Sequence, residues 1–165
     1  MIEFVGEAVA MLGRHCQRFE DKVRSHFEFL FSEYGFGMEH LQEASAGERC
    51  LLVLQGQFRI KFLYGKGDLE VSVGQNDAPP SWDDKIGGVR VWLPIWGVLR
   101  YVGGEPKLNS AERMKLGERF AAMDTDSYLA EIANSMRPLF SGIAKFFGSS
   151  EFPEDLRRFE QYLYA

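Results

Sequence analysis

The hydrophobic period of this chain changes at Gly35, and this change limits the folds that the chain can adopt. From residue 5 to residue 30, apolar side chains recur at alternating steps of four and three residues, the spacing of one face of an α-helix. Between residues 58 and 73 they alternate with polar side chains, the pattern of β-strands. Because a glycine readily adopts the left-handed conformation that ends helices, we predict a helix before Gly35 and a sheet after it.

The N-terminal pattern predicts either one long helix or two helices with a break near Gly13, because a glycine inside a helix costs about 1 kcal/mol relative to alanine. Beyond Gly35 we predict four strands, joined in part by short glycine turns, that form an antiparallel meander with one apolar face. Such a face needs helices packed on it. The predicted strands cover residues 36–42, 50–54, 58–64 and 69–73.

The second half of the chain predicts a loop followed by helices. Residues 74–88 are rich in glycine, proline and aspartate and show no period, and residues 89–104 predict a short extended segment and then a helical turn after Pro94. The predicted C-terminal helices cover residues 110–123, 125–147 and 154–164, and Pro138 is expected to kink or divide the second of them. With no linker or repeat, we predict one α+β domain over residues 1–165.

The sequence contains no local signature of an enzyme. The nucleophile elbow, the zinc-protease helix, the phosphate-binding loops and the calcium loop are all absent. His15 and His26 would stand about 16 Å apart along one helix, so they cannot share a metal ion. We therefore predict no catalytic residue, no metal site and no cofactor, although a site assembled from distant segments is left open.

The carboxylates allow two interpretations. Asp124 and Asp126 precede a helix and are expected to cap it. Asp83 and Asp84 follow Trp82 in a polar loop, which is either a lid packed back onto the sheet or a partner-facing anchor. Near the first strand, His40 lies between two glutamates and would need residues from another segment to build an acid-base site. The candidate partner-binding residues are Trp82, Asp83, Asp84, Asp77, Glu39, His40 and Glu43.

Charge, hydropathy and cysteine content limit the classes of partner and the cellular compartment that we expect. The 19 basic and 24 acidic residues give a net charge of −5, which disfavours nucleic acid as a partner. No apolar run approaches the ~18 residues of a membrane span, so no membrane partner is predicted. Cys16 and Cys50 lack metal-type or redox-type spacing, and we predict that both are reduced and that the protein is cytoplasmic.

The residues around Gly35 also carry a resemblance to known proteins. The segment FEFLFSEYGF at 27–36, followed after a polar spacer by LLVLQGQFRIKFLYGKGDLEVSVG at 51–74, resembles small uncharacterised bacterial α+β domains. Some of these are similar to immunity proteins of polymorphic toxin systems or are encoded among interbacterial-competition and phage-defence genes. The resemblance covers about residues 19–75. It implies a binding role and carries over no catalytic residue.

Charge, missing motifs and this resemblance together predict a non-enzymatic cytosolic binding protein of immunity type, which neutralises a protein partner such as a bacterial toxin. The alternative is a small enzyme or carrier with an apolar or small-molecule ligand between sheet and helices, since the chain has 14 phenylalanines that could line such a space. A third possibility is a subunit that docks on an assembly through Trp92 and Trp96. The sequence leaves the oligomeric state open.

Overall fold

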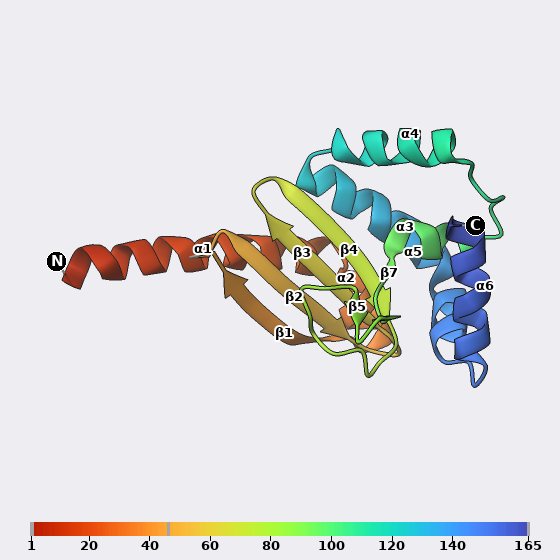
Figure 1. Cartoon of the computed structure of the whole chain (residues 1–165). Helices are drawn as coiled ribbons and strands as arrows, with labels where there is room; N and C mark the ends of the chain where they lie inside the picture. Colours follow the sequence, from red (N-terminus) through yellow and green to blue (C-terminus); the bar gives the residue numbers. More distant parts are fainter. Residues whose placement is uncertain (1, 46, 165) are drawn as a thin grey trace.

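The protein folds as an α+β domain in which helices cover one face of an antiparallel sheet (Figure 1). This computed structural model describes residues 2–45 and 47–164, with side chains from residue 13 onward. The helices are α1 (Ile2–His26), α2 (Glu28–Tyr34), α3 (Ile95–Val102), α4 (Ser110–Ala121), α5 (Thr125–Phe147) and α6 (Phe152–Tyr164). The strands are β1 (Gly37–Ala44), β2 (Arg49–Gln55), β3 (Arg59–Gly65), β4 (Asp68–Gly74), β5 (Lys85–Ile86), β6 (Val89–Arg90) and β7 (Leu93–Pro94).

The N-terminal helix is continuous through Gly13 and breaks instead at Phe27. The second of the two predicted possibilities, a break at Gly13, is therefore wrong. Phe27 is fully buried, and the short helix α2 that follows it ends at Gly35, which has a φ of 69° in the left-handed region. This confirms the predicted role of Gly35: its backbone conformation turns the chain from the helices into β1.

The sheet has the order β1-β2-β3-β4-β7, with every neighbouring pair antiparallel. The predicted four-stranded meander is confirmed, and β7 adds a short fifth strand beside β4. A separate two-stranded hairpin, β5–β6, lies within the segment that the sequence predicts as loop and extended chain. The long strand β1 forms one edge of the sheet, and its register with β2 shifts between Met38 and His40.

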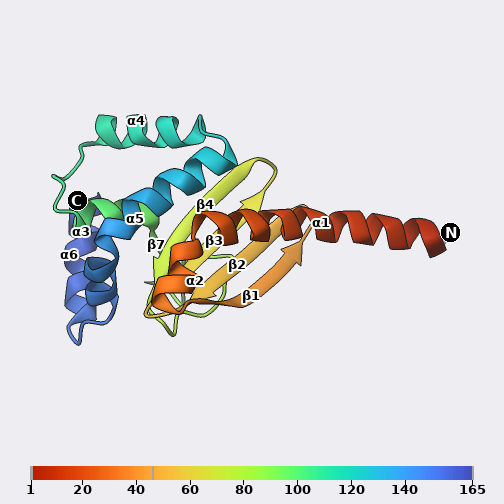
Figure 2. The same cartoon turned by 180° about the vertical axis from the view of Figure 1, so that it is seen from behind.

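The helix-covered face of the sheet carries the main hydrophobic core. Phe62 on β3 packs edge-on against Phe27 and Phe19, with ring centroids 5.4 and 6.2 Å apart. The ring of Phe58, just before β3, lies 5.3 Å from that of Phe140 of α5, measured between centroids. Helices α1, α2 and α5 therefore share one aromatic core with the sheet, and Figure 2 shows α1 and α2 in front of its strands.

The opposite face of the sheet is also buried, which the alternating pattern did not predict. Leu51, Val53 and Leu63 form a second apolar cluster with Ala78 and Trp92 of the segment that follows β4. We call residues 75–92 the cap segment. Because Trp92 is fully buried in this cluster, it cannot serve as a docking anchor on the surface.

A disulfide joins Cys16 of α1 to Cys50 of β2. The prediction that both cysteines are reduced is therefore wrong. The sequence places both on apolar positions, and only the packing of α1 over β2 brings their Cα atoms to 5.7 Å, a separation suited to a disulfide. Since disulfides persist mainly in oxidising compartments, the bond does not support the cytoplasmic location, which stays a prediction.

The C-terminal helices stand at one end of the sheet. Helix α5 runs through Pro138 without interruption, so this proline does not divide it. Asn109 begins α4 with a capping box: its side chain accepts from the Glu112 amide at 2.8 Å, and its own amide donates to the Glu112 carboxylate. Among the helices described, none is both long and apolar enough to cross a bilayer.

Candidate functional site

A lysine lies at the centre of the cap-segment face of the sheet. Lys61 on β3 has no exposed surface, although lysine is one of the residue types found least often in protein interiors. Its Nζ donates to the carbonyl oxygens of Ser81 and Asp83 at 3.0 and 3.3 Å and to a carboxylate oxygen of Asp84 at 2.9 Å. These acceptors satisfy all three N–H groups of the ammonium, which is what makes burial of its charge tolerable.

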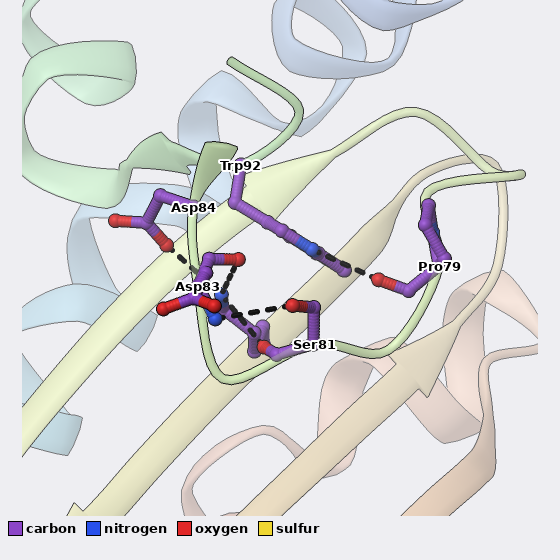
Figure 3. Close-up of polar contacts among 6 residues, drawn as sticks. Pro79, Ser81, Asp83, Asp84 and Trp92 are labelled. Carbon is purple, nitrogen blue, oxygen red and sulfur yellow. Dashed lines mark hydrogen bonds and ion pairs between the residues drawn. The ribbon is translucent and has the colours of Figure 1, made fainter. Parts of the chain in front are cut away.

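Further contacts hold the cap segment onto the sheet. The Lys61 ammonium lies 5.0 Å from the ring centre of Trp92, and the indole N–H of Trp92 donates to the Pro79 carbonyl at 3.0 Å (Figure 3). Arg59, also on β3, donates to the carbonyl of Ala78 at 2.7 Å. The cap segment is therefore fixed at several points by side chains of one central strand.

The predicted binding residues of the loop differ in how far they are buried in the cap segment. Trp82 is half-buried against the second cluster, and the Arg49 guanidinium lies 4.9 Å from its ring centre. Asp84 pairs with Lys61. The Asp83 carbonyl accepts a hydrogen bond from that lysine, and the Asp83 amide donates to the Ser81 hydroxyl (Figure 3). These contacts use only its backbone, and the residue is exposed. The lid interpretation thus describes Trp82 and Asp84 better than the anchor interpretation does.

The predicted residues of β1 separate onto the two faces of the sheet. Glu39 contacts the Arg59 guanidinium at 3.7 Å, which joins it to the cap segment. His40 is half-buried opposite Val53, on the same face, and its Nε2 lies 3.1 Å from the Gln42 side-chain oxygen. Glu43 is paired with Cys50 in the register and so belongs to the helix-covered face. The structure therefore does not bring Glu39, His40 and Glu43 together.

An exposed surface remains around the outer part of the cap segment. Asp77 and the Asp83 carboxylate are exposed there, and the β5–β6 hairpin presents Ile86 and Val89, which are 39% and 59% exposed. Ile86 and Val89 are direct partners across the hairpin, so their side chains form one apolar pair. We call Asp77, Asp83, Ile86 and Val89 the hairpin surface.

The other two predicted carboxylates, Asp124 and Asp126, lie at the N-terminus of α5. Asp124 caps α5, and the Ser127 amide that donates to it at 2.7 Å lowers the pKa of Asp124. Asp126 instead contacts His26 and Lys22 of α1, each at 3.0 Å. Its pKa is lowered first by the hydrogen bond from His26 and then by that from Lys22. The prediction that Asp126 caps the helix is wrong: its side chain links α5 to α1 instead.

A cavity of about 480 Å³ lies between α3, α4 and α5, and Trp96 is one of its lining residues. Its walls are mostly apolar, and its polar groups include Arg100 and Tyr128. Burial, followed by the charge of Glu70, raises the pKa of Tyr128 to about 12, so its hydroxyl stays protonated and can donate a hydrogen bond. Within the described chain, no group of three histidine, cysteine or acidic side chains is placed to hold a metal ion.

Sequence reasoning missed Lys61 and the lining of this cavity for different reasons. Lys61 alternates with apolar residues on β3 and is therefore expected to face solvent; no local signal reveals that residues twenty positions away cover it. The cavity had a weak signal in Leu116 and Phe120, which form an apolar pair four residues apart on a largely polar helix. Comparison of the chain with protein-family models, curated proteins and solved structures gives no match.

Proposed function

We propose that this chain is a non-enzymatic binding protein of immunity type, which neutralises a protein partner by covering it with the hairpin surface. The observation that carries this proposal is the anchoring of the cap segment by the buried Lys61. A loop held in this way loses little conformational entropy when a partner binds, and such preorganisation favours affinity.

The chemistry of the hairpin surface suits a protein partner. The cap segment exposes an apolar pair, Ile86 and Val89, together with two acidic residues, Asp77 and Asp83. Protein interfaces combine an apolar centre with a polar rim in this way. The acidic rim and the net charge of −5 favour a partner with a basic surface, which electrostatic steering would bring to the site faster. A toxin that acts on nucleic acid has such a surface.

The test is a capture experiment followed by a neutralisation assay. The affinity-tagged full chain is expressed in its native host, captured proteins are identified by mass spectrometry, and each is then expressed with and without the chain to see whether the chain relieves its toxicity. The variant Ile86→Arg/Val89→Arg should lose both capture and protection, because it places two positive charges at the centre of the contact.

Met114→Arg is the matched control, since Met114 is an exposed apolar residue, 67% accessible, on α4 (Figure 1). It should capture and protect as the wild type does. Equal capture and protection by the hairpin variant and the control would refute the assignment of the surface. Failure of the wild type to protect against any captured protein or the product of any neighbouring gene would refute the immunity function.

A further inference from the structure

The cavity between α3, α4 and α5 has the size and lining of a small-molecule site. Its volume of about 480 Å³ falls within the range of ligand pockets. Apolar side chains come from all three helices, among them Trp96 and Leu99 of α3, Leu116 and Phe120 of α4, and Leu139 of α5. The cavity is partly open to solvent, so a ligand can enter without unfolding of the domain.

Helix α4 spans the cavity as a strap held near both of its ends. At one end the Arg113 guanidinium donates to the Leu163 carbonyl of α6, and at the other Arg119 forms an ion pair with Glu131 of α5 at 2.6 Å. No residue of α4 is buried. Its apolar residues Leu116 and Phe120 line the cavity and remain partly accessible, whereas a packed amphipathic helix buries such a pair.

A buried donor lies in the wall of this cavity. Arg100 of α3 lines the cavity and donates from one terminal nitrogen to the Pro106 carbonyl at 3.0 Å. Its Nε–H is buried and has no hydrogen-bond partner among the residues described. Because arginine keeps its proton throughout the physiological pH range, the guanidinium carries a fixed positive charge and hydrogen-bond donors beside the cavity.

The remaining charged groups at the cavity leave Arg100 as its dominant charge. Arg119 and Glu131 neutralise each other in their ion pair. Glu105 lies at the exposed rim, where water screens its carboxylate, and it forms no ion pair with Arg100 in the described chain.

We propose that this cavity binds a small amphipathic carboxylate, with its apolar body against the leucine and aromatic side chains of the three helices and its carboxylate accepting hydrogen bonds from the Arg100 guanidinium. The site lies apart from the hairpin surface and is independent of the proposed immunity function. Charge-assisted hydrogen bonds between a guanidinium and a carboxylate are strong and short, so the anionic group decides the specificity.

The test compares three probes that share one chain length, namely decanoate, decan-1-ol and decylamine, each kept below the concentration at which it aggregates. Isothermal titration calorimetry with the full chain should show saturable binding of decanoate at one site, at least tenfold tighter than decan-1-ol. Decylamine should bind more weakly still. Equal affinity for decanoate and decan-1-ol, or no saturable binding of decanoate, would overturn the proposal.

Two variants locate the site. Arg100→Gln should weaken decanoate binding at least tenfold and leave decan-1-ol unchanged, whereas Arg157→Gln, which removes an exposed arginine of α6, should change neither. Ser135→Phe places a large ring in the cavity from α5 and should abolish binding of both probes. Circular dichroism verifies folding of each variant. If Arg100→Gln does not fold, Ser135→Phe decides: decanoate binding that survives in the folded Ser135→Phe protein contradicts the location.

Discussion

The two faces of the sheet are buried by different means. On the helix-covered face, Phe62 of β3 packs against α1 and Phe58, just before β3, packs against α5, in an apolar core without buried charge. On the cap-segment face a smaller apolar cluster surrounds Lys61, whose ammonium is satisfied by three oxygens of the cap segment. The first face draws its stability from apolar area, which is not directional. The second uses directional bonds, which fix the position of a segment that lacks long helices or strands.

The largest expected effect concerns the apolar core. Phe62→Ala removes a fully buried ring that contacts Phe19 and Phe27, and it should lower the free energy of unfolding by about 3–5 kcal/mol. Urea denaturation followed by circular dichroism measures the loss. A loss below about 1 kcal/mol would mean that this face is not the main source of stability.

Loss of the disulfide should have the second-largest effect on stability. Cys16 and Cys50 are 34 positions apart, and removal of a cross-link over such a loop is expected to cost about 2–4 kcal/mol. The double variant Cys16→Ser/Cys50→Ser should therefore unfold at lower urea concentration than the oxidised wild type. A reducing agent should destabilise the wild type and leave the variant unchanged. Titration of two free thiols in the purified native protein would contradict the bond.

Replacement of the buried lysine should have a smaller and more local effect. Lys61→Met keeps the length of the side chain but leaves the Ser81 and Asp83 carbonyls without their donor, at an expected cost of about 1–3 kcal/mol. Limited proteolysis should cut faster within residues 75–92. Lys145→Met, at an exposed position of α5, is the control. If both variants are cut at the wild-type rate, Lys61 does not fix the cap segment.

The smallest expected effect is that of the link between α1 and α5. Asp126→Asn weakens its contacts with Lys22 and His26 and should cost about 0.5 kcal/mol at neutral pH, because exposed ion pairs contribute little. Since the pKa of Asp126 is lowered in the folded protein, its contribution is present above the ordinary value of 3.8 and is lost as the pH falls through the folded value. The stability difference between wild type and variant should therefore shrink below pH 3.8; a difference that grows there would contradict this linkage.

The sequence predicted the helix-covered face well because both of its layers follow a regular period. The helical stripe through Phe19 and Val23 and the alternation through Ile60 and Phe62 each identify buried positions without knowledge of the other. Gly35 marks the turn between them. Amphipathic patterns of this kind are local, so they can be recognised from one chain.

The other face and the candidate sites depend on contacts between distant segments. In the alternating pattern of β3, Lys61 occupies a position that normally faces solvent, and it is buried because the cap segment covers it. The disulfide requires the packing of α1 on β2, and the cavity requires the strap formed by α4. Asp83 was predicted as a contact residue from its neighbours in a polar loop, and its exposure is consistent with that role without testing it.

The edge strand β1 also bears on how this protein behaves at high concentration. An unpaired strand offers a row of amide and carbonyl groups onto which a second molecule can add its own strand, the first step toward fibrils. Here Glu39 and Glu43 are exposed on that strand, and the register shift near Met38 makes its outer edge irregular. Charge repulsion and irregular geometry therefore protect the chain against self-association along β1, a role for these two glutamates that requires no partner.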